Sequence, residues 1–408
     1  MKLKLPIFLI PFLLLSAIGF SQNPQKNILF VGNSITYFND MPILFRDIAN
    51  NKGKNVATQM HTVGGAGFVN HVTDSNLYNL FRNTVWDAVV LQPGSGESAG
   101  ASWPVNTTIE RGQKLIDSIK KYSPCAKVFL YEIPYGVPSE TTYDTYQSVQ
   151  TQIKDSITKM ADNLHLPLVP AGESARMHYT VQQDLLLHGS YNDIHPNLNG
   201  SYLIASTMFA AIFQEPVTGT TSYGGVIQAT AEYFHSIADQ VVLPNKPQWR
   251  INTYNLHSGF NYVVNGNSIS FTNTSNNYTS LLWDFGDGIT SIQQNPTHIY
   301  TSGGIKIIKL KAIRNGCEEI IEKQIDLGTL STIGFEQNDA RLYPNPAHSV
   351  LNFETLSPTS IKIISTLGQE IFRSDEQKNN WQINVSTLQS GIYFVVTESQ
   401  SVYKFIKS

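Results

Sequence analysis

The chain has 408 residues, enough for two or three domains at about 150 residues each. Its 28 lysines and arginines against 31 aspartates and glutamates give a net charge of −3, which excludes the strongly cationic surface that nucleic-acid binding needs. Only 14% of the residues are charged and 41% are hydrophobic, so the chain can bury cores and global disorder is excluded.

The first 21 residues have the pattern of a secretory signal peptide. Lys2 and Lys4 form a basic start, residues 5–20 form an apolar run, and small residues precede the expected cleavage after Ser21. The apolar run is interrupted by prolines and is shorter than the roughly 20 residues of a stable transmembrane helix. We expect an exported protein with no membrane span once the signal is removed.

Cys125 and Cys317 are the only cysteines of the chain. An exported protein can form disulfides, but these two residues fall into different expected domains. The sequence therefore predicts two unpaired, buried thiols, and two cysteines are too few for a metal site built from cysteines alone.

Residues 22–243 alternate short apolar segments with longer periodic ones. Strands are expected at 27–31, 55–62, 86–91, 127–131 and 166–170, and helices at 41–51, 105–122, 146–164 and 198–213. This alternation predicts a parallel sheet with helices on both faces, a three-layer α/β/α domain. In such sheets ligands bind beyond the carboxyl ends of the strands.

The pattern changes after residue 243. Residues 244–247 read Pro-Asn-Lys-Pro and indicate a linker, and short alternating strands with Gly, Asn and Ser turns follow. We expect two small all-β sandwich domains, one at 244–330 and one at 335–408.

Two segments at opposite ends of the first domain together carry the chemistry of a serine hydrolase. Ser34 leaves the first strand in Gly32-Asn33-Ser34-Ile35-Thr36, and His195 lies on a loop in Asp193-Ile194-His195-Pro196-Asn197. A hydroxyl, an imidazole that takes its proton and an acid that orients the ring are the groups that nucleophilic acyl transfer needs.

These two blocks resemble those of the GDSL/SGNH hydrolase superfamily, over about residues 26–215 and in the same order along the chain. Asn33 stands where that family commonly has aspartate. The resemblance implies a flavodoxin-like α/β/α fold and an esterase activity with Ser34 as nucleophile and His195 as general base.

The residue that orients His195 has two candidates. The family places an acid three residues before the histidine, where this chain has Asn192, while Asp193 lies only two residues before it. We favour Asp193, because a carboxylate stabilises the imidazolium better than a neutral amide does.

The resemblance also implies donors for the oxyanion of the reaction. These are the N–H groups of Ser34 and of a glycine after the second strand, for which Gly65 is the best candidate and Gly64 the alternative. In the family's third block an asparagine supplies one more donor.

That third block reads Gly94-Ser95-Gly96-Glu97 in this chain, so the asparagine is missing. Losing one such donor costs about 2.7–4 kcal/mol of transition-state stabilisation. We therefore expect another side-chain amide in its place, either Gln92 or Asn70.

No metal or other cofactor is expected. The histidines outside the candidate site are scattered, without helical pairing or carboxylate partners, and are expected to be ordinary surface or core residues. They are His61, His71, His165, His178 and His188.

The two β modules carry resemblances of their own. Trp283-Asp284-Phe285-Gly286-Asp287-Gly288, with the segment 295–300, resembles the PKD domain, and its acidic residues are expected to form a turn. Residues 342–347 and 391–396 and the basic end at 403–408 resemble the C-terminal sorting domain of the type IX secretion system. That resemblance implies the secretion machinery as a partner and a secreted or cell-surface location.

The sequence as a whole predicts an exported serine esterase that removes O-acyl groups, such as acetyl, from carbohydrate. The alternative is a surface binding or adhesion protein whose first domain has lost turnover, which the missing third-block asparagine favours. A lipase-like enzyme ranks third, because no long apolar lid is evident.

Overall fold

The computed structural model describes residues 24–100, 104–328, 340–366, 368–399 and 401–408. The expected signal peptide, residues 1–21, lies outside the described residues. Within the ranges given, no helix is both long and apolar enough to cross a membrane.

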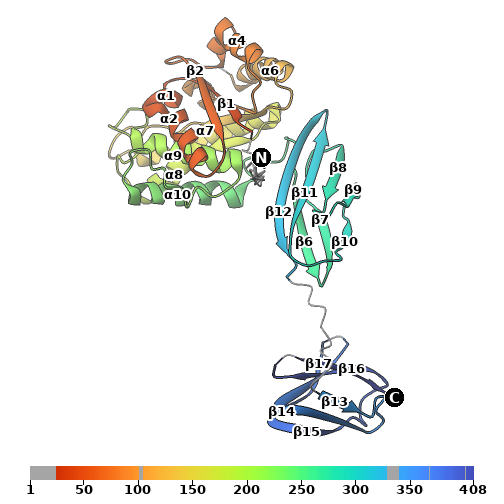
Figure 1. Cartoon of the computed structure of the whole chain (residues 1–408). Helices are drawn as coiled ribbons and strands as arrows, with labels where there is room; N and C mark the ends of the chain where they lie inside the picture. The colour runs from red at the N-terminus through yellow and green to blue at the C-terminus, as the bar shows by residue number, and fades with distance from the viewer. Residues whose placement is uncertain (1–23, 101–103, 329–339, 367, 400) are drawn as a thin grey trace, which may run out of the picture. The chain divides into compact units, whose positions relative to one another are not determined.

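The first part of the chain is built on a five-stranded parallel sheet in the order β2-β1-β3-β4-β5 (Figure 1). The strands are β1 (Lys26–Gly32), β2 (Val56–Thr62), β3 (Ala88–Leu91), β4 (Lys127–Glu132) and β5 (Leu168–Pro170). Because β1 lies between β2 and β3, the connections that leave these strands run in opposite directions. A ligand crevice forms at the carboxyl ends of strands at such a switch point.

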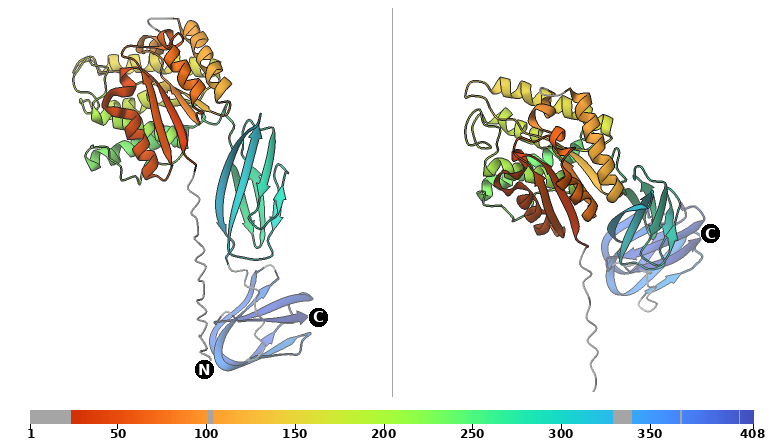
Figure 2. Two further views of the ribbon diagram at one scale, coloured as in Figure 1. Left: turned by 45° about the horizontal axis from the view of Figure 1, so that its top comes forward. Right: turned by 90° about the horizontal axis from the view of Figure 1, so that it is seen from above.

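Helices cover both faces of this sheet, so the predicted three-layer α/β/α architecture is confirmed (Figures 1 and 2). One face carries α2, α9 and α10, and the other carries α6 and α7. The α-helices are α1 (Ser34–Tyr37), α2 (Met41–Asn51), α3 (Phe68–His71), α4 (Ser75–Asn83), α5 (Ser95–Ala99), α6 (Val105–Tyr122), α7 (Tyr143–Leu164), α8 (Ala171–Val181), α9 (Leu198–Phe213) and α10 (Gln228–Val242). Two short 3₁₀ helices, η1 (Phe38–Asp40) and η2 (Leu243–Asn245), complete the set.

Helix α9 is the central helix of its layer. Helices α2, α8 and α10 and strand β5 all pack against it, so it is buried on every side, and its sequence is correspondingly apolar all round. Its first turn follows directly on the loop that carries His195, so the most buried helix of the domain anchors that loop.

The core of the α/β domain continues past the expected boundary at residue 243. Trp249 and Ile251 belong to the same buried cluster as the sheet residues. The N–H of Leu168 donates to the carbonyl oxygen of Trp249 at 2.8 Å, and the Arg250 guanidinium pairs with Asp162 at 2.7 Å. Residues 249–251, which follow the expected linker, are therefore packed onto the α/β domain.

The second module is all-β and antiparallel, as expected. Its two sheets have the orders β10-β7-β6 and β12-β11-β8-β9. The strands are β6 (Phe260–Asn265), β7 (Ser268–Asn273), β8 (Ser280–Asp284), β9 (Thr290–Ser291), β10 (Thr297–Ile299), β11 (Ile305–Arg314) and β12 (Cys317–Asp326). Trp283 is fully buried, and the rings of Phe260 and Phe271 pack against it.

The acidic residues after β8 form a turn, as the sequence predicts. The carboxylate of Asp284 accepts the N–H of Gly286 at 2.9 Å, and that of Asp287 accepts the N–H of Ile289 at 3.1 Å.

The C-terminal module is also antiparallel. Its strands are β13 (Ala340–Tyr343), β14 (Val350–Ser365), β15 (Glu370–Asn384), β16 (Gly391–Thr397) and β17 (Val402–Lys407). The long strand β14 pairs with β13, β15 and β16, so it runs through the centre of the module. Phe353, Ile363 and Phe405 are among the residues of its separate buried core.

The two cysteines form a disulfide, so the expectation of unpaired thiols is wrong. Cys125 lies in the turn before β4 and Cys317 begins β12, and their Cα atoms are 5.4 Å apart. The ion pair between Lys127 and Glu319, with N and O 2.7 Å apart, lies two residues further along each strand. The expectation failed because residues of two different expected domains can still meet, as the turn before β4 and the start of β12 do here.

We expect the unreduced protein to show no reactive thiol in denaturant and two after reduction, measured by thiol titration. Replacing both cysteines by serine should lower the free energy of unfolding by about 2–5 kcal/mol, the usual effect of losing a native disulfide. Two reactive thiols in the unreduced, denatured protein would show that the bond is absent.

Candidate active site

Ser34 lies where strand β1 turns into helix α1, at the carboxyl edge of the sheet. The preceding Asn33 caps the helix, because its side-chain oxygen accepts the N–H of Ile35 at 3.0 Å. The same side chain donates through Nδ2 to the carbonyl oxygen of Ala66 at 2.9 Å. An aspartate at this position lacks that donor, so Asn33 ties the serine turn to the glycine loop after β2.

Gln92 does not take the place of the missing third-block asparagine. Its Oε1 accepts the N–H of Asn33 at 3.1 Å and the hydroxyl of Thr36 at 2.6 Å. Its Nε2 donates to Asn33 Oδ1 at 2.8 Å and to the carbonyl oxygen of Pro93 at 3.3 Å. The side chain is fully buried with its amide engaged at both ends, so Gln92 holds the serine turn and has no free donor for an oxyanion.

The structure brings Ser34, His195 and Asp193 into one hydrogen-bonded chain. His195 Nε2 lies 2.9 Å from Ser34 Oγ, and His195 Nδ1 lies 2.7 Å from Asp193 Oδ1. The imidazole therefore bridges the hydroxyl and the carboxylate, which is the geometry of a nucleophile, its base and an orienting acid.

Of the two candidates for orienting His195, Asp193 is the one whose side chain contacts the ring. Asp193 Oδ1 also accepts the backbone N–H of His195 at 2.9 Å. This backbone hydrogen bond, and after it the hydrogen bond to the ring, lowers the pKa of Asp193. Asn192 adopts a left-handed backbone, with φ of 61°, and donates its N–H to the carbonyl oxygen of Val137 at 2.8 Å. This turn brings the acid two residues before the histidine into position.

The glycine loop after β2 presents backbone N–H groups near the serine turn. The N–H of Ala66 donates to the carbonyl oxygen of Val63, which closes a tight turn with Gly65 at φ of +70°. Glycine suits that position because the turn needs a positive φ. Among the residues the structure describes, no acceptor is found for the N–H of Gly64, Gly65 or Ser34, and the last begins a helix and so lacks an intrahelical partner.

Glu97 is a residue of this site that sequence reasoning missed. It is fully buried, and its carboxylate accepts the N–H groups of Gly94, Phe68 and Val69 at 2.9, 2.7 and 2.9 Å. It thus joins the loop after β3 to helix α3, which follows the glycine loop. The only hint in the sequence is an acid within an otherwise uncharged third block. Its close fit against Gly67, where a Cβ would lie 2.3 Å from the carboxylate, is visible only in the fold.

Asn70, the other amide considered, stands in α3. Its Oδ1 accepts the N–H of Gly67 at 3.0 Å, and the residue is exposed. Asn70 therefore helps to shape the loop that carries Gly65.

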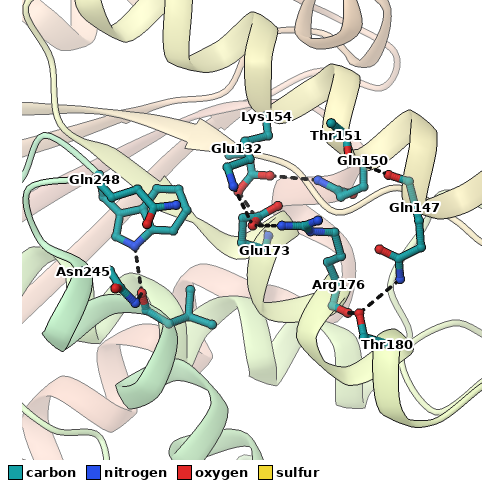
Figure 3. Close-up of polar contacts among 12 residues, drawn as sticks. Glu132, Gln147, Gln150, Thr151, Lys154, Glu173, Arg176, Thr180, Asn245 and Gln248 are labelled. Atoms are coloured by element: carbon teal, nitrogen blue, oxygen red, sulfur yellow. Dashed lines mark hydrogen bonds and ion pairs between the residues drawn. The ribbon is translucent and has the colours of Figure 1, made fainter.

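A second polar cluster lies at the end of β4 and joins this strand to helices α7 and α8 (Figure 3). Glu132 is buried, and its carboxylate accepts Gln150 Nε2 at 2.9 Å and the backbone N–H of Glu173 at 3.2 Å. The carboxylate of Glu173 in turn binds Lys154 at 3.1 Å and also binds Arg176. Because Gln150 also accepts the N–H of Tyr135 at 2.9 Å, the cluster supports the loop that follows β4.

Burial, followed by the negative charge of Glu173, raises the pKa of Glu132 from 4.5 to about 8. The folded protein thus favours the protonated form of Glu132. The stability that this protonation contributes is complete below about pH 4.5 and is lost as the pH rises to about 8. We expect Glu132→Gln to remove this pH dependence. Between pH 5 and 8 the wild type should lose a few kcal/mol of unfolding free energy relative to the variant, since one pKa unit corresponds to about 1.4 kcal/mol.

Denaturant unfolding at pH 5, 6.5 and 8 measures this difference. The exposed Glu110→Gln is the matched control and should follow the wild type. Parallel curves for Glu132→Gln and the wild type would contradict the assignment.

Within the described part of the chain, no group of three metal-ligating side chains is found. The expectation that the scattered histidines lack carboxylate partners is wrong for two of them. His61 contacts Asp74 at 2.8 Å and His178 contacts Asp184 at 2.9 Å, whereas His71 contacts the carbonyl oxygen of Gly32 at 3.1 Å.

Comparison with known proteins assigns the two β modules. Residues 261–325 match the PKD domain, and residues 341–408 match the secretion system C-terminal sorting domain. The sorting domain indicates export and a secreted or cell-surface location, and it implies contact with the type IX secretion machinery. No curated protein matches the chain.

Several solved structures are similar to the chain. One is a DUF4886 family protein from Bacteroides uniformis, at 17% identity and a TM-score of 0.47, covering 55% of this chain and 97% of that one. A second is a putative SGNH hydrolase from Slackia heliotrinireducens, at 19% identity and 0.38, covering 46% and 98%. A third is a variant of an acetyl-xylooligosaccharide esterase from Geobacillus, at 12% identity and 0.37, covering 45% and 92%.

The chain thus combines a three-layer α/β/α domain, a region that matches the PKD domain and a region that matches the secretion system C-terminal sorting domain, in the order expected from the sequence.

Proposed function

We propose that the chain is an exported serine esterase of the SGNH type, with Ser34 as nucleophile, His195 as general base and Asp193 as orienting acid. The observation that carries this proposal is the continuous contact from Asp193 through His195 to Ser34, at 2.7 and 2.9 Å.

The reaction follows from this geometry. Ser34 Oγ attacks the ester carbonyl while His195 Nε2 takes its proton, and the ionised Asp193 holds Nδ1–H and stabilises the imidazolium. The imidazolium then returns the proton to the leaving alcohol, and a water activated by the same histidine releases the acid. The backbone N–H groups of Ser34 and Gly65 are the donors for the oxyanion, and no step needs a metal or other cofactor.

For the substrate we propose O-acylated, in particular O-acetylated, carbohydrate. An exported enzyme meets polymers outside the cell, and the PKD domain that follows gives it a β module able to act as a spacer or polymer contact. The substrate class rests on this domain combination, which is an argument by analogy.

The test is a hydrolysis screen of the purified protein, with acetate released from acetylated xylan compared with cleavage of short-chain aryl esters and long-chain lipids. We expect turnover of the acetylated and short-chain substrates above that of the long-chain lipids. Preference for long-chain lipids would overturn the substrate class, and no turnover on any ester would overturn the enzyme assignment.

A surface binding protein is the second candidate, and one observation favours it. Gly96 occupies the position of the third-block asparagine, and Gln92, the amide beside it, is fully engaged. Binding of acetylated glycan by a wild-type protein without turnover is the result that this candidate requires.

The sorting domain yields a separate prediction. Deleting residues 335–408 should leave an active enzyme in the periplasm, because the α/β domain has its own core and the deleted module has a separate one. Fractionation and immunoblotting measure the location, and activity in the periplasmic fraction is the control for folding. Unchanged surface or medium levels of the truncated protein would contradict this role.

A further inference from the structure

The segment after the nucleophile helix has an unusual backbone. Asn39 and Asp40 follow each other in the left-handed region, with φ of 54° and 51°. Such a conformation is costly for a residue other than glycine and persists only where the surroundings enforce it. Capping of α2 does not account for it, because Asp40 makes no side-chain cap hydrogen bond to that helix.

The side chain of Asn39 shows what this left-handed kink at residues 39 and 40 achieves. Its Nδ2 donates to the carbonyl oxygen of Pro196 at 3.0 Å and to Ser201 Oγ at 3.0 Å. Ser201 is fully buried in α9, and its hydroxyl donates to the carbonyl oxygen of Phe38 at 3.1 Å. The kink is therefore joined to the residue directly after His195 and to the central helix that anchors the histidine loop.

The neighbouring Phe38 touches the histidine itself. Its ring stacks on the imidazole of His195, with centroids 4.4 Å apart and planes inclined by 18°. One short segment, continuous with the helix that begins at Ser34, thus packs on the face of the imidazole and holds the backbone next to it. Ser34 and His195 are 161 residues apart in sequence, and this segment is a direct link between them.

We propose that Asn39 is a positioning residue that fixes His195 Nε2 against Ser34 Oγ, by binding the Pro196 carbonyl and Ser201 and by presenting the Phe38 ring to the imidazole. The proposal rests on the proposed function, since its consequence for turnover presupposes that Ser34 and His195 act as nucleophile and base. The left-handed backbone aims the amide at Pro196, and asparagine is among the residues that tolerate that conformation best.

Three substitutions at Asn39 distinguish the effect of losing its hydrogen bonds from the effect of its left-handed backbone. Asn39→Asp keeps the size and tolerates the left-handed region but cannot donate, Asn39→Gly relieves the backbone and lacks the side chain, and Asn39→Ala lacks the donor. All three should lower kcat by the order of 10²-fold with little change in KM, because small misplacements of catalytic groups have effects of that size. The matched control is Asn50→Ala, which also removes an exposed asparagine whose amide bonds a backbone carbonyl, that of Val56. It should leave kcat unchanged.

A double-mutant cycle distinguishes positioning from general damage. In a His195→Ala background, Asn39→Ala should lower the residual rate no further, since its effect passes through the histidine. An undiminished loss in that background, or unchanged kcat in all three Asn39 variants, would overturn the proposal.

An NMR measurement, which needs no turnover, tests the positioning role of Asn39 independently of the proposed esterase activity. Stacking on Phe38 should shift the Cε1 proton of His195 upfield in NMR spectra of protein labelled at histidine, and Phe38→Leu should abolish that shift. Asn39→Ala should reduce the shift, and Asn50→Ala should leave it as in the wild type. A His195 signal unaffected by Asn39→Ala but moved by Phe38→Leu would overturn the positioning role even if the wild type hydrolyses no ester.

Discussion

Replacing Ser34 by alanine is expected to lower ester hydrolysis at least about 10³-fold, and His195→Ala should have an effect of similar size. Without the hydroxyl no acyl-enzyme can form, and without the imidazole no group takes the proton from Oγ. The two effects should not add, because the members of such a constellation act as a unit. What remains is the contribution of the backbone donors and of substrate binding.

The measurement is the initial rate on a short-chain aryl ester together with thermal unfolding of each variant. Ser206→Ala is the matched control, because it removes another buried serine hydroxyl of the same domain, in the core helix α9. It should retain the wild-type rate. Retained turnover in Ser34→Ala would place the nucleophile elsewhere.

Asp193→Asn is expected to lower turnover by up to about 10⁴-fold, the size seen when the aspartate of a serine triad is neutralised. The hydrogen bonds from His195 keep the pKa of Asp193 low, so the wild-type carboxylate is ionised across the neutral range. An asparagine there can still contact Nδ1, but it does not stabilise the imidazolium and can present the wrong tautomer.

The comparison variant is Asn192→Gly, because glycine accepts the positive φ of 61° at that position without strain. It should cost far less activity than Asp193→Asn. The reverse ranking would assign the orienting role to Asn192, and Asn192→Asp should then raise the rate.

The sequence specified the fold well because periodicity and turn chemistry are local properties. The α/β alternation, the Asp284–Asp287 turn and the sorting strands all depend on residues close together in the chain. The serine and histidine blocks were recognisable for a related reason, since the residue types and their place after β1 and before α9 define the chemistry. The spacing of the acid was ambiguous until the backbone at Asn192 showed which residue turns toward the ring.

What sequence reasoning missed depends on contacts between distant segments. The amide of Gln92 has the right chemistry for an oxyanion donor, but its Nε2 already donates to Asn33 Oδ1 and to the carbonyl oxygen of Pro93. Glu97 lies beside the position of the missing asparagine and binds backbone N–H groups, which no pattern of residue types reveals. The disulfide between Cys125 and Cys317 likewise depends on where a turn and a strand start meet in space.

That disulfide changes what proteolysis does to an exported protein. Because it joins residues 192 positions apart, a single cut anywhere between residues 126 and 316 leaves both fragments covalently attached. A nicked molecule keeps its mass on a non-reducing gel and separates only after reduction, so its serine and histidine segments stay together. A cut after Asp326 lies outside this closed loop and releases the sorting domain, while residues 125–317, which carry the histidine block, stay joined to the rest of the protein.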